Sequence, residues 1–460
     1  MEKNSLVTLS SLLMVCCNLT IAQSTPNIIF ILTDDQRYDA IGYAGNKQIL
    51  TPALDSLARQ GVFFRNAFAT TPISAASRAS ILTGLHERTH GYTFEQGEIK
   101  PQFMNTSYPI ILKEANYYTG FFGKLGVDYV DSKNLFDEAE FFDRNSTYSD
   151  NRAYFYKTIG TDTVHLTHYT SYKAMQFISK APSNKPFYLS IHFSAPHAHD
   201  LSKNQYFWDA DSDNLYKETH IPAPALSTNN YFEELPDAVK NGFNHTRWAW
   251  RFDTPEKYQQ MVKGYYRMIT DVDREVFRIR ELLAEKGFDK NTIIIFASDN
   301  GYFLGERQLA DKWLMYDLSI RIPLIVYDPR YTRHLDVMDL VANVDIPATI
   351  LSLAGCNIPK LYQGKNLDAI WNKKGKYQKR DDLLCEHLWN NKSIPSSEGL
   401  RTKRWKYFRY RNVSVNEYLY DLSKDINEEV NLATLPKYKT VLQKLRQKCE
   451  DKISLYSNHN

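Results

Sequence analysis

Four short, mostly apolar runs, each followed by polar residues, constrain the fold of this 460-residue chain more than any other feature. They are NIIFILT (27–33), GFFG (120–123), PFYLSIHFSA (186–195) and NTIIIFAS (291–298). A strand with one face in water alternates apolar and polar residues, and these runs do not. Continuous apolar runs of this length are typical of strands buried on both faces of a parallel sheet.

Helical patterns lie between these runs, for example at residues 51–60 and 258–286. Strands that alternate with helices predict an open α/β sheet with helices on both faces. In such sheets ligands bind beyond the carboxyl ends of the strands. Here those ends carry Asp-Asp, Gly-Lys, Pro-His and Asp-Asn, which predicts a functional site at this edge of the sheet.

The two acidic strand ends predict a metal site formed by Asp34, Asp35, Asp299 and Asn300. Three carboxylates and an amide at adjacent strand ends repel one another unless a cation lies among them. All four offer hard oxygen donors, which favours Ca²⁺ or Mg²⁺ over zinc. The alternative is that each pair only caps a helix or turn. That alternative suits one pair alone, whereas two pairs at the ends of core strands favour the metal.

The segment at residues 71–84, TPISAASRASILTG, is a turn that enters a helix. The backbone N–H groups and the dipole at a helix N-terminus favour a bound oxyanion. Ser74 is a candidate nucleophile there, and Arg78, one turn further, a candidate clamp for a tetrahedral anion. The spacing alone favours the alternative, an N-terminal capping serine with a solvated arginine.

This segment resembles the signature of the sulfatases of the alkaline-phosphatase superfamily. That signature is Cys or Ser, any residue, Pro or Ala, any residue, Arg, followed shortly by Leu-Thr-Gly. Ser74, Ala76 and Arg78 match its first part, and residues 82–84 match its second. The resemblance extends from Asn27 to about Ala433. It implies a large, mixed, mostly parallel sheet sandwiched by helices (alkaline-phosphatase-like), with a smaller C-terminal antiparallel sheet plus helix.

The resemblance also implies the chemistry of the site. In the family the Cys or Ser is oxidised to formylglycine, whose hydrate is the nucleophile, so Ser74 is expected to carry this modification. One Ca²⁺ is expected among the acidic strand ends, with modified Ser74 as a further ligand. The remaining implied residues are Arg78, Lys124 and Lys312, which neutralise the sulfate, and His197, which contacts the ester and protonates the leaving alcohol.

Two segments depart from the family pattern. The usual Gly-Lys-Trp-His reads Gly-Lys-Leu-Gly at residues 123–126, so the histidine that contacts formylglycine is missing, with His90 or Asp128 as candidate replacements. The usual Gly-Glu-His ends in Arg307 instead of histidine, although Lys312 follows as expected.

The N-terminal residues indicate a targeting segment. Residues 1–22 contain a short apolar stretch that ends in Ala22, which is typical of a cleaved secretory signal. Serine-type signatures are matured in the family by a bacterial radical enzyme, so we expect a formylglycine-generating partner and a periplasmic or extracellular bacterial protein. The alternative is a cysteine that was exchanged for serine.

The remaining chain divides into a catalytic domain at residues 23–365 and a C-terminal subdomain at 366–460. In the latter, residues 382–389, 401–410 and 417–423 predict strands, and residues 436–456 a helix. Aromatic, acidic and basic side chains on these strands are candidates for contacting a sugar at the pocket mouth. These candidates are Glu386, His387, Trp389 and Arg401. The alternative for each is ordinary sheet packing.

Composition excludes several classes of protein. Hydrophobic residues make up 43% and charged residues 24%, which excludes wholesale disorder. A formal net charge of +3 argues against binding nucleic acid through bulk charge. No apolar run in the body of the chain is long enough to cross a bilayer. Three hypotheses remain: a sulfatase acting on a carbohydrate, a phosphoester or phosphonate ester hydrolase of the same superfamily, and a non-catalytic protein that binds sulfated glycans.

Overall fold

The computed structural model describes residues 25–331, 333–373, 375, 377–411, 413 and 417–457. The predicted signal segment at residues 1–22 lies outside the described residues. Within them no helix is long and apolar enough to span a membrane.

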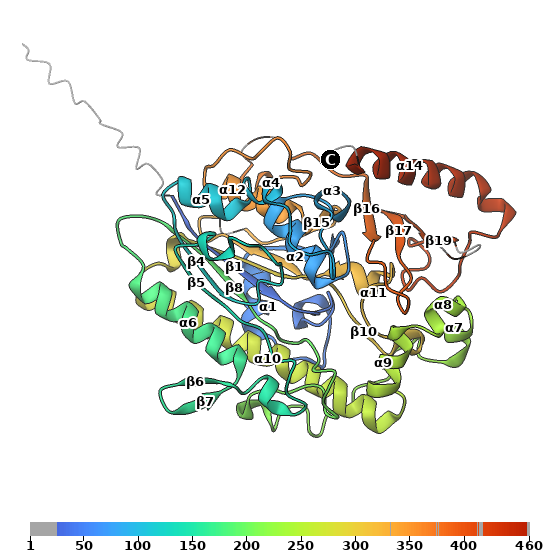
Figure 1. Ribbon diagram of the computed structural model, residues 1–460, viewed down its shortest axis with the longest axis horizontal. Coiled ribbons are helices and arrows are strands. Elements are labelled where there is room, and N and C mark those ends of the chain that lie inside the picture. Colours follow the sequence, from blue (N-terminus) through green and yellow to red (C-terminus); the bar gives the residue numbers. More distant parts are fainter. Residues whose placement is uncertain are drawn as a thin grey trace, which may run out of the picture.

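A large eight-stranded sheet forms the centre of the protein (Figure 1). Its strands follow the order β14-β2-β13-β9-β1-β8-β4-β5. They are β1 (Asn27–Thr33), β2 (Val62–Phe64), β4 (Tyr118–Gly123), β5 (Glu138–Phe141), β8 (Phe187–His192), β9 (Thr292–Ser298), β13 (Leu324–Tyr327) and β14 (Leu335–Val337). Only β13 runs antiparallel to its neighbours in this sheet. The four predicted strands are confirmed as its central members.

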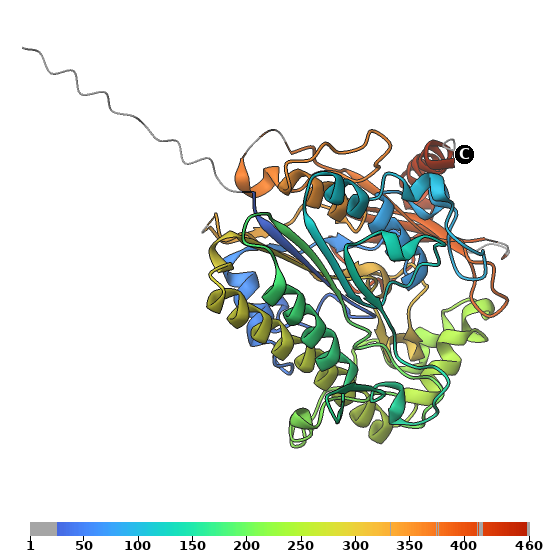
Figure 2. The same cartoon turned by 60° about the vertical axis from the view of Figure 1, so that its left-hand side comes forward.

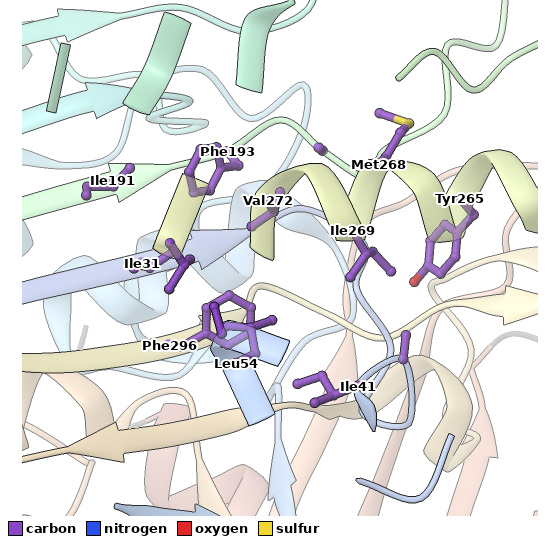
Figure 3. Close-up of a cluster of buried hydrophobic side chains, with 14 of the residues drawn as sticks. Ile31, Ile41, Leu54, Ile191, Phe193, Tyr265, Met268, Ile269, Val272 and Phe296 are labelled. Atoms are coloured by element: carbon purple, nitrogen blue, oxygen red, sulfur yellow. The ribbon is translucent and has the colours of Figure 1, made fainter. Parts of the chain in front are cut away.

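The two central strands β1 and β9 are buried along their whole length, as the apolar runs predict. Alternate residues of β1 enter different cores: Ile29 and Ile31 lie in one, and Phe30 and Leu32 in the other. Figure 3 shows the first of these cores, in which Ile31 packs near Leu54 of the helix α1 (Pro52–Gln60) and Val272 of the helix α10 (Pro255–Glu285). Burial on both faces explains why β1 has no polar residue between its ends.

Helices cover both faces of the sheet (Figures 1 and 2). One face carries α1, α10 and α6 (Leu166–Lys180), whose buried residues share one core. The other face carries α2 (Ser74–Thr83), α5 (Tyr108–Glu114) and α12 (Asp345–Leu353). Pro255 stands in the first turn of α10 and the side chain of Thr254 caps it, so this helix begins three residues before its predicted start.

A second, antiparallel sheet is built from β16 (Asp382–His387), β17 (Ser397–Thr402), β18 (Trp405–Tyr410) and β19 (Glu417–Asp421), with α14 (Lys439–Ser457) packed against it. The prediction of one strand over residues 401–410 is wrong. β17 ends at Thr402, and a bend at residues 403–404 leads into β18. The polar segment 396–399, SSEG, hid β17 in the sequence. Gly399 is required there, because a Cβ atom would lie 2.3 Å from the carbonyl oxygen of Tyr407.

Shorter elements complete the chain. The short strands are β3 (Ala67–Phe68), β6 (Lys157–Ile159), β7 (Asp162–Val164), β10 (Phe303–Leu304), β11 (Ala310–Asp311), β12 (Arg321–Ile322) and β15 (Val341–Ala342). The short helices are α3 (Glu87–His90), α4 (Pro101–Met104), α7 (Asn229–Glu233), α8 (Asp237–Lys240), α9 (Phe243–Arg251), α11 (Asp317–Ile320) and α13 (Ala369–Asn372). Cys356, Cys385 and Cys449 are free cysteines.

Gly123 ends β4 where this strand pairs with β8. Its φ of +114° lies in the region that disfavours side chains, and a Cβ atom would lie 1.9 Å from the carbonyl oxygen of His192. Glycine at this position therefore allows the chain to turn sharply and deliver Lys124 at the edge of the sheet.

We expect Gly123→Ala to lower the free energy of unfolding by about 3 kcal/mol or more, because backbone strain and a clash in the sheet add. Gly91→Ala is the matched control, since Gly91 has a φ of +66° but a Cβ atom added there would meet no heavy atom within 4 Å. That control should lose only about 1–2 kcal/mol. Urea unfolding of both variants measures the difference, and equal losses would contradict the close approach.

Candidate active site

The parallel register brings the predicted polar residues to one edge of the sheet. Leu32 of β1 lies beside His192 of β8, and Thr33 lies beside Ser298 of β9. Asp34 and Asp299, the next residues of β1 and β9, therefore leave the sheet together. Gly123 of β4 pairs with His192, so Lys124 leaves at the same level.

The four predicted metal ligands lie together and are fully buried. The backbone N–H of Asp35 donates to Asp299 Oδ1 at 3.1 Å, and Asn300 Nδ2 donates to Asp35 Oδ1 at 2.8 Å. Asp35 has a φ of +69°, a left-handed conformation that is uncommon outside glycine and is found at functional sites. His197 joins this group, since ligand atoms of Asp34, Asp35 and His197 lie within 4.8 Å of one another.

Ser74 lies beside this acidic group at the first position of α2. Its Oγ donates to Asp34 Oδ1 at 2.9 Å, and the residue is only 2% exposed. The helix N-terminus and its dipole face the same place, which favours negative charge there. The prediction of a serine at a helix entrance is confirmed, and the alternative of a solvated arginine is wrong, because Arg78 and the rest of the helix are buried.

Three cations predicted to neutralise a sulfate surround the carboxylates. Arg78 Nε donates to Asp299 Oδ2 at 2.9 Å, and Lys124 Nζ donates to Asp34 Oδ2 at 2.5 Å. Lys312 Nζ donates to both oxygens of Asp35, at 2.6 and 2.7 Å. Arg78 Nη2 is buried without a hydrogen-bond partner among the described residues. It is therefore a free donor on α2, one turn after Ser74.

Lys312 lies in a segment with unusual backbone geometry. Asp311 and Trp313, on either side of it, have φ angles of +77° and +78°. Left-handed conformations of side-chain-bearing residues persist only where surrounding structure holds them, and they cluster at functional sites. Asp311 is held by ion pairs to Arg247 and Arg251 of α9, and the N–H of Trp313 bonds to the carbonyl oxygen of Pro72.

Burial and neighbouring charges shift the pKa values of the three carboxyl groups in different directions. Burial raises the pKa of Asp35 to about 7, because the ammonium of Lys312 offsets only part of the burial penalty and Asp34 adds to it. Burial and the charge of Asp34 also raise the pKa of Asp299. The pKa of Asp34 instead lies well below its usual value, since Lys124 and other cations outweigh the effect of burial.

His197 follows the cis peptide bond between Ala195 and Pro196. Its Nδ1 lies 2.6 Å from the carbonyl oxygen of Ala198, and its Nε2 lies 3.0 Å from Lys312 Nζ. Burial first, then the neighbouring charges of Arg144 and Lys312, lowers its pKa well below the ordinary histidine value. The ring is therefore neutral near pH 7 in this arrangement.

The two departures from the family pattern have structural explanations. Gly126 has a φ of +69°, and a Cβ atom there would lie 2.6 Å from Cδ of Arg78, so no histidine fits at this position without moving Arg78. The guanidinium of Arg307 lies 4.7 Å from the ring centroid of Tyr316 and bonds to the carbonyl oxygen of Glu428, which ties it to the C-terminal part. His90 contacts Ser80 Oγ at 3.0 Å, six residues beyond Ser74 along α2.

The four predicted sugar contacts differ in their surroundings. Glu386 and His387 are fully buried, and Glu386 forms an ion pair with Arg88 at 2.6 Å. Arg401 is buried and pairs with Asp317 at 3.1 Å. These surroundings favour the packing alternative for the three residues. Trp389 is half-buried and packs beside Ile73, the residue before Ser74, so it borders the site.

The sequence reasoning missed Asp143 and Arg144, which follow β5. Asp143 Oδ2 lies 3.3 Å from Lys124 Nζ, and Arg144 Nη2 lies 3.2 Å from His197 Nε2. A cavity of about 660 Å³ opens beside them, lined by Lys124, Gly126 and Asp128 among others. The sequence carries little signal for them, because residues 138–141, EAEF, lack the continuous apolar pattern of the predicted strands and Phe142 separates them from this charged pair.

The donor set suits a hard divalent cation. Carboxylate oxygens predominate, and Asn300 Oδ1 is buried with no hydrogen-bond partner in the described part of the chain. A buried carbonyl oxygen without a partner is costly unless something binds it.

Comparison with known proteins identifies the chain. The sulfatase family model matches residues 26–356, and the model of the N-sulphoglucosamine sulphohydrolase C-terminal region matches residues 305–454. The chain belongs to the sulfatase family. It is therefore a sulfuric ester hydrolase, and the resemblance predicted from the Ser74 segment is confirmed.

Individual relatives agree with this assignment. An N-acetylglucosamine-6-O-sulfatase of Bacteroides thetaiotaomicron is 25% identical to this sulfatase, over 95% of the chain and 87% of the relative. An arylsulfatase of Clostridium perfringens is 28% identical, over 92% of the chain and 93% of the relative.

Solved structures confirm the alkaline-phosphatase-like fold. A protein solved in complex with its substrate D-glucosamine-2-N,6-O-disulfate matches with a TM-score of 0.79 and 24% identity, covering 95% of this chain and 99% of that one. The phosphonate monoester hydrolase of Agrobacterium radiobacter matches with a TM-score of 0.77 and 20% identity, covering 94% and 96%. At these identities the likeness establishes the fold alone.

We expect Ca²⁺ to raise the melting temperature of this sulfatase and to do so in a saturable way, because a cation bound only by the folded state stabilises it by mass action. At a hundredfold excess over Kd the gain is about 2.7 kcal/mol. Asp35→Asn should abolish this shift. Asp336→Asn, which removes a half-exposed carboxylate paired with Arg65, should keep it. Thermal melts against Ca²⁺ and Mg²⁺ measure it, and an unshifted wild type would refute the metal site.

Proposed function

We propose that this sulfatase removes O-sulfate groups from a carbohydrate, with Ser74 oxidised to formylglycine and one Ca²⁺ bound beside it. The observation that supports this most is the contact between Ser74 Oγ and Asp34 Oδ1 at the N-terminus of α2. It places the residue that matches the modified position of the family signature next to the acidic group and within a ring of buried cations.

The carbohydrate part of the proposal is supported by the relatives. One is named for N-acetylglucosamine-6-O-sulfate chemistry, and one structural neighbour was solved with a disulfated glucosamine. The C-terminal region matches the corresponding part of N-sulphoglucosamine sulphohydrolase. Trp389 at the border of the site offers an aromatic face of the kind that stacks on sugar rings. Glu386, His387 and Arg401 stay candidates for sugar contact only if the C-terminal sheet shifts to expose them.

Asp34, Asp35, Asp299, Asn300 and modified Ser74 would hold the Ca²⁺. When bound, the ion and the aldehyde hydrate supply an acidified hydroxyl as nucleophile and a second hydroxyl for release of sulfate. The side chains around the site would bind the sulfate and balance its charge.

Each cation of the ring has its own part in binding the sulfate. Arg78 offers its unpaired Nη2 to a sulfuryl oxygen, while Lys124 and Lys312 balance the negative charge that the substrate brings. His197 contacts the ester from the side of Lys312. Because all these groups are buried, their electrostatic effect on the ester is stronger than it would be in water.

The remaining parts of the proposal concern the whole chain. Residues 23–365 would form the catalytic domain and residues 366–460 the C-terminal subdomain. A signal peptide at residues 1–22 would direct the protein to the periplasm or outside of a bacterium. A serine-type radical maturation enzyme would be its partner, and no nucleic acid is expected to bind.

The phosphoester and phosphonate ester alternative shares the fold, as the hydrolase of Agrobacterium radiobacter illustrates. A two-zinc phosphatase needs several histidine ligands beside its carboxylates. The group of side chains that could hold a metal ion in the described residues contains one histidine, His197. A binding protein without catalysis would instead keep Ser74 unmodified.

We expect the tryptic peptide Asn66–Arg78, from protein made in its native host, to lack two hydrogens or to show the corresponding hydrate. Ser74→Ala should lower turnover by at least about 10⁴-fold, because the reacting group is lost. The free energy of unfolding should change by only about 1 kcal/mol, the value of one hydrogen bond. Mass spectrometry, sulfate release and urea unfolding measure these effects.

Ser80→Ala is the control for this variant, since Ser80 lies in the same helix but faces His90. It should keep the modification and most of the turnover. An unmodified Ser74 with full sulfate release in the native host would contradict the assigned role.

We also expect the matured enzyme to prefer sulfate over phosphate monoesters of the same alcohol by at least about 10²-fold in kcat/KM, because the acidic group of Asp34, Asp35, Asp299 and Asn300 would hold one divalent ion and not two. Paired assays with 6-O-sulfated and 6-phosphorylated N-acetylglucosamine measure this. A preference for the phosphate would support the phosphatase hypothesis, and binding of the sulfated sugar without turnover would support the binding protein.

A further inference from the structure

Arg144 is a further cation of the site that none of the sequence motifs indicated. It stands three residues after the end of β5. One terminal nitrogen, Nη2, lies 3.2 Å from His197 Nε2, and the other, Nη1, lies 3.3 Å from both carboxylate oxygens of Asp143. Its side chain is only 16% exposed, so it is not a freely solvated surface arginine.

The loop that carries Arg144 is held firmly. Tyr156 Oη donates to the carbonyl oxygen of Asp143 at 2.5 Å, and the N–H of Asn145 donates to the carbonyl oxygen of Ala153 at 2.9 Å. The buried Tyr154 reaches across and donates to the carbonyl oxygen of His197. The backbone of this loop and the turn that carries His197 are therefore fixed relative to each other.

Arg144 continues the charged ring on the side of His197. Lys124 contacts Asp143, Asp143 contacts Arg144, and both Arg144 and Lys312 contact Nε2 of His197. Two cationic donors thus converge on one point, 3.0 and 3.2 Å from the same ring nitrogen.

The orientation of the guanidinium limits what it can bind. A second carboxylate or sulfate on the sugar would be gripped by two parallel N–H bonds from the Nη1–Nη2 end. Here Nη1 faces Asp143 and Nη2 faces His197. This arrangement suits one directed hydrogen bond toward the ester beside His197 and Lys312, and not a paired grip on a separate anion.

We propose that Arg144 contacts the substrate and stabilises the ester oxygen that leaves with the alcohol. The inference rests on the proposed function, since it assumes that the ester lies beside His197 and Lys312. In the overall reaction the S–O bond to the alcohol breaks, its electron pair stays on the alcohol oxygen, and that oxygen gains one hydrogen of the consumed water. A new S–O bond forms to the oxygen of that water, whose second hydrogen is released as a proton with the sulfate. Arg144 stays protonated throughout and only donates an N–H hydrogen bond to the leaving oxygen.

A leaving-group series tests this assignment. The substrates are aryl sulfates, from 4-nitrophenyl through phenyl to 4-methoxyphenyl sulfate, whose leaving oxygens become progressively more basic. The enzymes are the matured wild type, Arg144→Met and Arg144→Lys. For Arg144→Met we expect kcat/KM to fall by less than about 3-fold on the nitrophenyl ester. On the methoxyphenyl ester it should fall by about 10²-fold, the effect of removing one oxyanion donor. Arg144→Lys should lie between.

The matched control is Arg152→Met, on the same loop. Arg152 is 62% exposed and pairs only with Asp150 among the ion pairs of the described residues. It should leave the dependence on leaving group unchanged. Thermal melts check folding, and Arg144→Lys retains the charge if the methionine variant is unstable.

The outcomes separate this inference from the proposed function. A loss of equal size across the whole series, with wild-type turnover intact, would overturn the role of Arg144 on the leaving oxygen and leave the sulfatase proposal standing. A loss confined to KM and present only for sugars with a second anionic group would overturn it as well. A wild type that carries formylglycine and hydrolyses no sulfate ester would overturn the proposed function, and this inference with it.

Discussion

The site depends on the burial of three carboxylates in one small volume. Asp34, Asp35 and Asp299 are each fully buried at the ends of β1 and β9. Buried like charges are strongly unfavourable unless opposite charges lie among them. Removing one partner of a buried ion pair strongly destabilises the folded state, because the other charge stays buried without compensation. Lys124 and Lys312 meet this requirement at hydrogen-bonding distance. The cations that stabilise the acidic group are thus the same groups that the proposed mechanism turns toward sulfate.

The surrounding architecture serves to hold this group in place. Parallel pairing of β1 with β8 and β9 sets the level at which each polar segment leaves the sheet. The C-terminal sheet braces the turn before Ser74: the N–H of Glu386 donates to the carbonyl oxygen of Thr70, and the Glu386 carboxylate pairs with Arg88. These contacts explain why Glu386 and Arg401, which the sequence suggests as sugar contacts, are buried against α3 and α11.

Prediction from the sequence succeeded where local pattern carries the information. The unbroken apolar runs at residues 27–33 and 292–298 identify central strands because burial on both faces leaves no room for polar side chains. It failed at β17, where SSEG is typical of a loop and only the antiparallel pairing with β16 and β18 reveals a strand. It also missed Arg144, because a single arginine after an edge strand has no distinguishing local signature.

The sequence by itself determined the α/β class, the acidic and basic residues at the strand ends and, through the Ser74 segment, membership of the sulfatase family. Those features are encoded in short stretches, in which period, residue type and spacing act together. Tertiary structure alone decided which cation pairs with which carboxylate, that a side chain at position 126 would collide with Arg78, and that Arg144 contacts His197. These contacts join residues more than 40 positions apart, and their energies depend on burial and on distances that only the folded chain sets.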